Sequence, residues 1–262
     1  MNTTTEAVAS EAGHYYTRAG EPAYEVPNVS RGGMRPTRPV DAKRLQLVPS
    51  VTTILSCAYR PALELWKVKQ AVLAAATLPK IDGESGDEWV RRVQTDAKQE
   101  AGDAAHTGTA IHAAIETYLV SDLLSMRYGR ETVGACDEVR RLTGLDPRMD
   151  FSPERSFAHP LGFGGKCDLS SQKWIVDFKG KEFDHEDLQS LKIYDDHEMQ
   201  LAAYRVGLNA PQARCGIVYV SRNEPGLAYG IEVPDHRLDR GWGMFKGLLE
   251  YWKAKNAYDS AF

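Results

Sequence analysis

The stretch of sequence that decides the fold is Gly164-Gly165-Lys166-Cys167-Asp168, followed by Trp174-Ile175-Val176-Asp177-Phe178-Lys179. Each half has the apolar character of a β-strand, and a short hairpin or crossover between them would bring Asp168 alongside the second strand. Successive side chains of a strand point to opposite faces, so Asp177 and Lys179 project together. The pattern predicts two carboxylates and one ammonium group at a single place on a sheet.

This grouping has a chemical interpretation and a simpler alternative. Two carboxylates beside an ammonium suit a hard divalent cation and a charge stabiliser, as in Mg²⁺-dependent cleavage of a phosphodiester. Taken alone, Asp177 and Lys179 are better explained as the solvated face of an ordinary antiparallel strand, because Asp-x-Lys is commonplace.

Two predicted helices flank the strands and carry further polar pairs. In the upstream segment 108–116, His112 and Glu116 are four residues apart and share one helix face. In the downstream segment 197–204, Gln200 and Tyr204 are also four residues apart and share one helix face. Each pair is usually structural when it occurs alone. The order of four motifs is much less expected by chance: a helix with His, a strand with Asp, a strand with Asp-x-Lys and a helix with Gln-x-x-x-Tyr.

In this order the four motifs resemble the RecB-like branch of the PD-(D/E)xK nuclease superfamily. The similarity is to phage-type exonucleases like the mitochondrial genome maintenance exonuclease group. The segments 47–55 and 63–66 resemble the N-terminal part of that group, so the resemblance spans about residues 49–204. Gly180 and Lys181 depart from it, since relatives often carry Thr after Asp-Phe-Lys; this leaves the metal ligands intact and affects only local backbone or phosphate contacts.

The resemblance implies an α/β fold, with a restriction-endonuclease-like mixed central sheet flanked by helices and an N-terminal helical elaboration. It divides the chain into an N-terminal tail, hairpin and loop at 1–48 and a nuclease domain at 49–262. Within that domain, residues 49–121 form the helical section, and residues 150–262 form the catalytic sheet with its flanking helices.

The resemblance also implies a metal centre. The implied ligands of Mg²⁺, or of Mn²⁺ in its place, are His112, Asp168, Asp177 and the backbone carbonyl of Phe178. The implied catalytic residues are Asp168, Asp177, Lys179 and Glu116. Of these, Lys179 would orient the attacking water or stabilise transition-state charge, and Glu116 would hold a metal-bound water or a second ion.

The resemblance places DNA contacts at four further residues. Gln200 and Tyr204 would contact phosphate or sugar, or brace the catalytic strand. Arg91 and Arg92 lie in the section that, in the resembled exonucleases, arches over the active site and admits a single strand by its end. Trp66 and Trp89 lie in the same section and are explained equally well as base-stacking or as core residues.

The implied activity is Mg²⁺-dependent hydrolysis of phosphodiester bonds from DNA ends, in phage or prophage recombination, replication or DNA processing. The implied partners are DNA, single-stranded or with free ends, and a phage recombination or single-strand-binding protein. Two alternatives stay open, namely a catalytically inactive nucleic-acid-binding module and an endonuclease of the same fold.

Composition sets bounds on these expectations. The chain has 262 residues, 42% of them hydrophobic, which is enough for one full core. No apolar run approaches the ~20 residues that span a bilayer, and the polar N-terminus lacks a secretory core. We therefore expect no membrane partner and a cytoplasmic location, in the bacterial host cell if the chain is phage-encoded.

Charge and cysteines carry less information. The net charge of −4 is unusual for a protein that binds a polyanion, although much of the acidity is concentrated in residues 182–198. Charge therefore neither supports nor excludes the nuclease interpretation. Cysteines 57, 136, 167 and 215 are scattered without a Cys-x-x-Cys spacing, so no iron–sulfur cluster is expected, and Cys167 and Cys215 are predicted to be small buried hydrophobes.

Periodicity and turn residues predict the remaining elements. Residues 1–13 are expected to be disordered, 14–26 to form a hairpin and 27–39 a loop. Helices are predicted from Val51, capped by Ser50, from Pro61, over 85–121, and over a final apolar stripe from Leu238 to Trp252. The predicted strands are 155–158, 163–169, 174–179, 216–220 and 227–233.

Overall fold

The structure, a computed structural model, describes residues 13–28 and 32–262. Its contacts divide the chain into two compact units. The larger unit comprises the residues up to Ala58 and those from Ile111 onward, and the smaller unit is Tyr59–Ala110. The disorder expected for residues 1–13 falls, apart from Gly13, outside the described residues.

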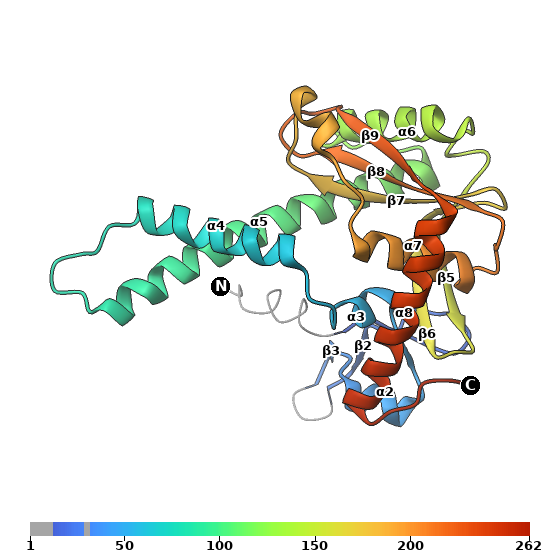
Figure 1. Cartoon of the computed structure of the whole chain (residues 1–262), viewed down its shortest axis with the longest axis horizontal. Coiled ribbons are helices and arrows are strands. Elements are labelled where there is room, and N and C mark those ends of the chain that lie inside the picture. Colours follow the sequence, from blue (N-terminus) through green and yellow to red (C-terminus); the bar gives the residue numbers. More distant parts are fainter. Residues whose placement is uncertain (1–12, 29–31) are drawn as a thin grey trace. The chain divides into compact units, whose positions relative to one another are not determined.

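A mixed five-stranded sheet forms the centre of the larger unit (Figure 1). Its strands are β5 (Ser152–His159), β6 (Phe163–Ser170), β7 (Trp174–Lys181), β8 (Arg214–Ser221) and β9 (Ala228–Val233), in that spatial order. The pair β7–β8 is parallel, and the other neighbours are antiparallel. All five predicted strands are present, and the predicted mixed α/β fold with flanking helices is confirmed.

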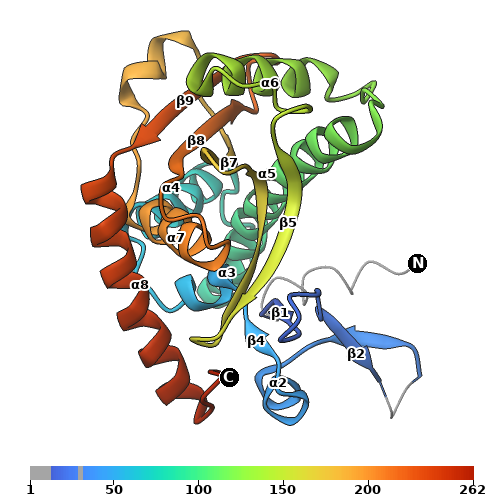
Figure 2. The ribbon, with the colours of Figure 1, turned by 90° about the vertical axis from the view of Figure 1, so that its right-hand side faces the viewer.

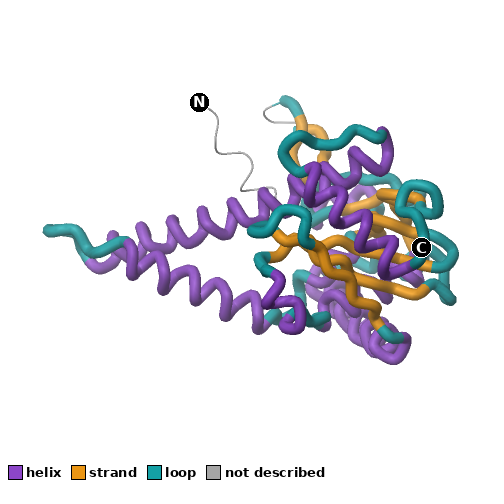
Figure 3. The backbone as a smooth tube through the Cα atoms, turned by 90° about the horizontal axis from the view of Figure 1, so that it is seen from above, coloured by secondary structure: helices purple, strands orange, loops and turns teal. Residues whose placement is uncertain are grey.

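Helices cover both faces of this sheet (Figures 2 and 3). The helices α3 (Val51–Leu55), α7 (Asp195–Gly207) and α8 (Asp235–Asn256) pack over one face, where they share a core with the sheet. The other face packs against α6 (Gly129–Thr143) and the C-terminal part of α5 (Gly86–Ser121). A short 3₁₀ segment, His185–Ser190, lies between β7 and α7.

Strand β7 shows the predicted alternation. Ile175 belongs to the core on the α7 face, whereas Val176 and Phe178 belong to the core on the α5–α6 face. Asp177 and Lys179 therefore share the α7 face with Ile175. The final helix α8 also behaves as predicted, since its apolar stripe from Leu238 to Trp252 is buried.

The N-terminal segment forms the predicted turn and an additional pairing. The arms of the hairpin expected at 14–26 are joined by the Tyr16–Pro22 bridge and by backbone hydrogen bonds from Ala23 to Tyr15 and from Thr17 to Glu21. In addition, β1 (Tyr15–Tyr16) pairs with β4 (Val48–Pro49). A second small sheet joins β2 (Glu25–Pro27) to β3 (Met34–Pro36), and α2 (Pro39–Leu45) follows. The expected loop at 27–39 thus contains β3, which pairs with β2 just before it; the Gly/Pro/Arg-rich composition of this stretch gave no strand pattern.

Local capping signals were reliable. The Ser50 side chain accepts a hydrogen bond from the Thr53 backbone N–H at the start of α3. Pro61 occupies the first turn of α4 (Pro61–Thr77) in the smaller unit. Among the residues that the structure describes, no helix is both long and apolar enough to cross a membrane.

The smaller unit consists of α4, the connection after it and the first part of α5. The indole N–H of Trp89 donates to the Leu78 carbonyl at 2.7 Å. The guanidinium of Arg92 contacts the Glu84 carboxylate at 3.0 Å and the Pro79 carbonyl at 2.8 Å. Trp89 and Arg92 thus tie α5 to the connection that precedes it.

Candidate active site

The site forms where two neighbouring strands separate. β6 and β7 pair only at Leu169–Val176 and Ser170–Ile175, so the ladder opens one residue before Leu169. There the carboxylate of Asp168 accepts a hydrogen bond from the Phe178 backbone N–H, with Oδ2 and N 2.8 Å apart. The side chain replaces the missing strand carbonyl, since a buried N–H needs a partner. Asp168 is thereby held beside the strand that carries Asp177, as the sequence predicted.

A hydrogen-bonded network surrounds Asp177 on the α7 face. Lys179 Nζ lies 2.6 Å from Asp177 Oδ2, and Gln200 Nε2 donates to Asp177 Oδ1 at 2.8 Å. Gln200 also accepts from Lys179 Nζ at 3.0 Å and contacts the Tyr204 hydroxyl at 2.9 Å. The two predicted pairs, Asp177 with Lys179 and Gln200 with Tyr204, therefore meet in one cluster.

Both oxygens of the Asp177 carboxylate are engaged within the protein. Asp177 is only 2% exposed. Its Oδ2 atom is paired with the Lys179 ammonium, and its Oδ1 atom accepts from Gln200. A buried carboxylate is stable only when it is paired and hydrogen-bonded in this way. A metal ion at Asp177 would therefore share the carboxylate with Lys179.

Charge in the site is strongly coupled. Burial raises the pKa of Asp168 well above its usual range, and the negative charge of Asp177 raises it further. Burial opposes the charge on Lys179, but Asp177 and Asp168 outweigh it, so the pKa of the lysine is raised. Lys179 therefore stays protonated at neutral pH, and its charge offsets part of the two carboxylates' mutual repulsion.

His112 approaches the opening between the strands from α5. Its Nδ1 atom lies 3.6 Å from Asp168 Oδ2, and its ring stands edge-on to Phe178. Burial lowers the pKa of His112, an effect partly offset by Asp177 and by a hydrogen bond to the Phe178 backbone. The imidazole is therefore neutral near pH 7, which is the form that binds metals.

The predicted metal ligands form two adjacent groups. His112, Asp168 and the Phe178 backbone lie together, whereas the carboxylate of Asp177 faces Lys179 and Gln200. Residues 13–28 and 32–262 contain no cluster of three or more His, Cys, Asp or Glu side chains that could hold a metal as they stand. The donors nonetheless suit Mg²⁺ or Mn²⁺ in kind, since they are carboxylates, a backbone carbonyl and an imidazole.

The structure adds two residues that the sequence analysis missed. The β5–β6 register pairs Pro153 with Leu169 and Arg155 with Cys167, which places Glu154 opposite Asp168. Glu154 forms an ion pair with Lys166, whose side chain shares a strand face with Asp168. Lys166 was visible in the sequence as the residue two before Asp168, but Glu154 depends on a strand register that the sequence does not disclose.

Glu116 lies near this second ion pair. Burial raises the pKa of Glu154, and the negative charge of Glu116 raises it further. At Lys166, burial lowers the pKa, but Glu154 and then Glu116 outweigh it, so the pKa of the lysine is raised. The helix face predicted for His112 and Glu116 therefore looks onto the β5–β6 end of the site.

A second buried histidine, His197, also borders the network. Its Nδ1 atom lies 3.1 Å from the Tyr219 hydroxyl. Burial and then the charge of Lys179 lower the pKa of His197 to about 4. His197 thus remains neutral at physiological pH and was not singled out as a site residue from the sequence.

The remaining predicted DNA contacts, Arg91 and Arg92, belong to the smaller unit. Arg92 is engaged within that unit by Glu84 and the Pro79 carbonyl. Arg91 is exposed. Of the pair, Arg92 is held by contacts within its unit, whereas Arg91 is directed to solvent.

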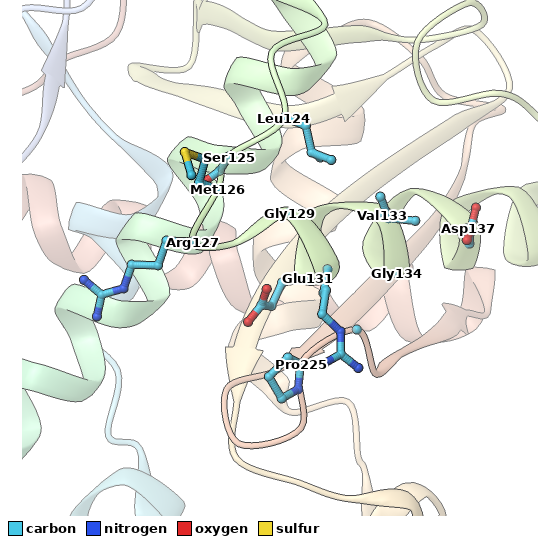
Figure 4. Close-up of a pocket in the computed structure, with 12 residues that line it drawn as sticks. Leu124, Ser125, Met126, Arg127, Gly129, Glu131, Val133, Gly134, Asp137 and Pro225 are labelled. Carbon is cyan, nitrogen blue, oxygen red and sulfur yellow. The ribbon is translucent and has the colours of Figure 1, made fainter.

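An open surface pocket of about 710 Å³ lies elsewhere on the larger unit (Figure 4). The N-terminal part of α6 and the β8–β9 connection line it, with Arg127, Arg130, Glu131 and Pro225 among its residues. None of its lining residues belongs to the Asp168–Asp177 site. The candidate site is therefore defined by the opening between β6 and β7, not by this pocket.

Comparisons with known proteins find a distant similarity in structure only. No protein-family model matches the chain, and no curated protein matches it in sequence. Among solved structures, an alkaline exonuclease from Laribacter hongkongensis is similar at a TM-score of 0.30 and 14% identity, over 74% of this chain and 98% of that one. A protein named SSO0001 is similar at 0.31 and 15% identity, over 71% and 85% of the two chains. The chain thus has a distant structural similarity to an alkaline exonuclease.

Proposed function

We propose that this chain is a metal-dependent exonuclease that hydrolyses phosphodiester bonds from DNA ends. The observation that carries the proposal is the buried Asp177, paired with Lys179 at 2.6 Å and placed beside Asp168 where β6 and β7 separate. Two carboxylates and a protonated lysine at a strand opening are the groups that phosphodiester hydrolysis with a divalent cation requires. The proposed setting is DNA recombination, replication or processing in a phage or prophage.

The cation, Mg²⁺ or Mn²⁺, would be held by Asp168, Asp177 and His112. When bound, it supplies a Lewis acid for the scissile phosphate and lowers the pKa of a water molecule. Asp168 and Asp177 provide the negative charge that retains it. His112 is kept neutral by burial, so its ring nitrogen can act as a ligand at neutral pH.

Lys179 supplies electrostatic stabilisation in this proposal. Its raised pKa keeps it protonated, so it suits a phosphate oxygen that gains negative charge better than it suits proton abstraction. Gln200 acts through other groups, because it orients both Asp177 and Lys179 and is itself fixed by Tyr204. Gln200 and Tyr204 are thus better described as positioning residues than as direct ligands of DNA.

The test uses three DNA substrates that carry the same sequence. End-labelled linear single strands, linear duplexes and closed single-stranded circles are incubated with the protein in Mg²⁺ and in EDTA. We expect linear DNA to be shortened from its ends with Mg²⁺ only and the circle to resist. Efficient cutting of the circle would instead identify an endonuclease, and binding without cleavage of any substrate would identify an inactive binding module.

Variants connect this activity to the site. Asp177→Asn should abolish cleavage, because the amide keeps the shape but loses the ligand charge. Asp82→Asn, an exposed residue of the smaller unit, is the matched control and should cleave normally. Equal activity of the two variants would place the chemistry elsewhere.

A further inference from the structure

A second lysine–carboxylate pair lies beside the candidate active site. Lys166 and Asp168 are two residues apart on β6 and so project to the same face of the sheet. Lys166 forms an ion pair with Glu154, whose side chain is 20% exposed, while 35% of the Lys166 side chain reaches solvent. The ammonium group is thus paired with Glu154 on the strand face that carries Asp168, and it remains accessible.

The backbone at Glu154 is unusual for this residue type. Its φ angle is +51° within β5, a left-handed conformation that costs free energy for a residue other than glycine. Such conformations cluster at functional sites, where the surrounding structure enforces them. Here the enforced geometry is the one that presents the carboxylate to Lys166.

The N-terminal segment lies against the same part of β6. Tyr16 packs on Gly164, where an added Cβ atom would lie 3.0 Å from the tyrosine Cβ. The Tyr16 hydroxyl is hydrogen-bonded to the Tyr24 hydroxyl at 2.7 Å, and the two rings meet edge to face. Tyr24 is therefore anchored through Tyr16, which packs on β6 two residues before Lys166.

Tyr24 also stacks on His14, with ring centroids 4.5 Å apart and an interplanar angle of 27°. The His14 backbone is fixed at both ends, because its N–H donates to Thr53 Oγ1 at 2.9 Å and its carbonyl accepts from the Ser50 N–H at 2.8 Å. His14 is exposed and Tyr24 is partly exposed. The stacked pair is thus an ordered aromatic surface that solvent reaches.

Electrostatics agree with this placement. Although His14 is exposed as a residue, partial desolvation of its ring lowers the pKa of the imidazole, and the charge of Lys166 lowers it further. Tyr24 is among the groups that raise the pKa of Lys166. The aromatic pair and the ammonium group therefore lie within electrostatic reach of each other.

We propose that Lys166 and the His14–Tyr24 pair form a nucleotide subsite, in which Lys166 binds a backbone phosphate and the aromatic pair stacks a base next to the reacting phosphodiester. The ligand is one nucleotide unit of a single strand. Glu154 is a positioning residue that holds Lys166 until a phosphate displaces it. This inference rests on the proposed function and specifies how the same site holds its substrate.

Aromatic stacking and a single cation are sufficient for such a subsite. Stacking of a base on an aromatic side chain contributes about 1–3 kcal/mol and is tolerant of sequence. It needs no basic surface, which agrees with a net charge of −4 for the chain. Lys166 adds one phosphate contact, which is sensitive to salt.

The experiment measures binding separately from cleavage. A fluorescein-labelled ten-nucleotide DNA strand and an abasic strand of the same length are titrated with the protein in EDTA, by fluorescence anisotropy at several salt concentrations. The variants are Lys166→Met, Glu154→Gln and Tyr24→Ala. Lys173→Met, at the exposed β6–β7 turn, is the matched control for lost charge.

The three variants are expected to behave differently. Lys166→Met weakens binding of both strands about tenfold and lowers the salt slope by about 0.7, as for one phosphate contact on a single strand. Glu154→Gln strengthens binding, because the carboxylate that competes with phosphate is gone. Tyr24→Ala weakens binding of the normal strand about fivefold or more and leaves the abasic strand unaffected.

Other outcomes overturn the proposal. If Lys166→Met behaves like Lys173→Met, Lys166 does not bind phosphate. If Tyr24→Ala weakens both strands equally, the aromatic pair has only a structural role, which thermal unfolding of the variant would also register. If the wild-type protein cleaves DNA while all three variants bind as it does, the subsite is wrong and the proposed function stands. If the wild type neither binds nor cleaves, the proposed function fails, and the subsite fails with it.

Discussion

Replacing Lys179 with methionine would reveal how much the ammonium group offsets the two buried carboxylates. In the wild type, Lys179 Nζ lies 2.6 Å from Asp177 Oδ2. At an effective dielectric constant of about 20, two unit charges at this distance attract each other by about 6 kcal/mol. Desolvation cancels part of this, and removing one partner of a buried ion pair typically costs about 3–5 kcal/mol. Because 29% of the Lys179 side chain is exposed, we expect the lower end, about 3 kcal/mol.

The pH dependence gives this prediction its sign. Burial and Asp177 already raise the pKa of Asp168 in the folded protein, and Lys179 is a cation that lowers it. Without Lys179, the pKa of Asp168 in the folded protein should lie still further above its value in the unfolded chain. When an acid has a higher pKa in the folded protein than in the unfolded chain, the free energy of unfolding falls as the pH rises from the unfolded-state pKa to the folded-state pKa. The loss in Lys179→Met should therefore be large at pH 8 and small at pH 4.

Urea unfolding in EDTA at the two pH values measures the effect, with Lys173→Met as the control for loss of an exposed lysine. The difference in unfolding free energy between wild type and Lys179→Met should grow with pH, while the control stays near zero at both. An equal loss at pH 4 and pH 8 would refute the reasoning, because it would show that packing of the lysine side chain, and not its charge, stabilises the site.

Three further predictions concern neighbouring groups. Asp168→Asn should abolish cleavage but raise the thermal unfolding temperature in EDTA at pH 8, because it removes a buried carboxylate whose ionisation is unfavourable; a lower unfolding temperature would contradict this. Gln200→Leu should lower kcat more than it raises KM, since it frees both Asp177 and Lys179 from their common partner; a change in KM alone would point to direct DNA contact. Arg91→Ala should weaken DNA binding and flatten its salt dependence without altering unfolding, whereas Arg92→Ala should also destabilise the smaller unit, as its contact with Glu84 is lost; identical unfolding curves for both variants would argue against that structural role.

Features that depend on local periodicity were predictable from the sequence. The shared face of Asp177 and Lys179 follows from strand alternation, and that of Gln200 and Tyr204 from helical spacing. The Ser50 cap is likewise local. These signals were sufficient to place the central strands and the polar network correctly.

Features that depend on long-range pairing were not predictable. Glu154 faces Asp168 only because β5 pairs with β6 in one particular register, and β1 pairs with β4 more than thirty residues later in the chain. Nothing in the local pattern distinguishes these pairings from others, because side-chain period alone does not fix a partner or a register. The aromatic pair of His14 and Tyr24 was missed for the same reason.

The hydrogen bonds around Asp177 differ from the expected set of metal ligands. The sequence suggested that His112, Asp168 and Asp177 converge directly, whereas Asp177 is engaged by Lys179 and Gln200. The orientation of a carboxylate depends on which donors surround it, and the helix that supplies Gln200 is more than twenty residues away. The ligand role of Asp177 therefore remains a prediction, supported by the burial of its carboxylate beside the opening between β6 and β7.

The most direct test of the central claim is the rate at which a linear, end-labelled DNA strand is hydrolysed as a function of Mg²⁺ concentration. The account predicts that the rate saturates with Mg²⁺, is abolished by EDTA and is restored by adding Mg²⁺ or Mn²⁺ in excess of the chelator, and that Asp177→Asn stays inactive at every concentration. Hydrolysis at the wild-type rate in EDTA, or by Asp177→Asn, would contradict it.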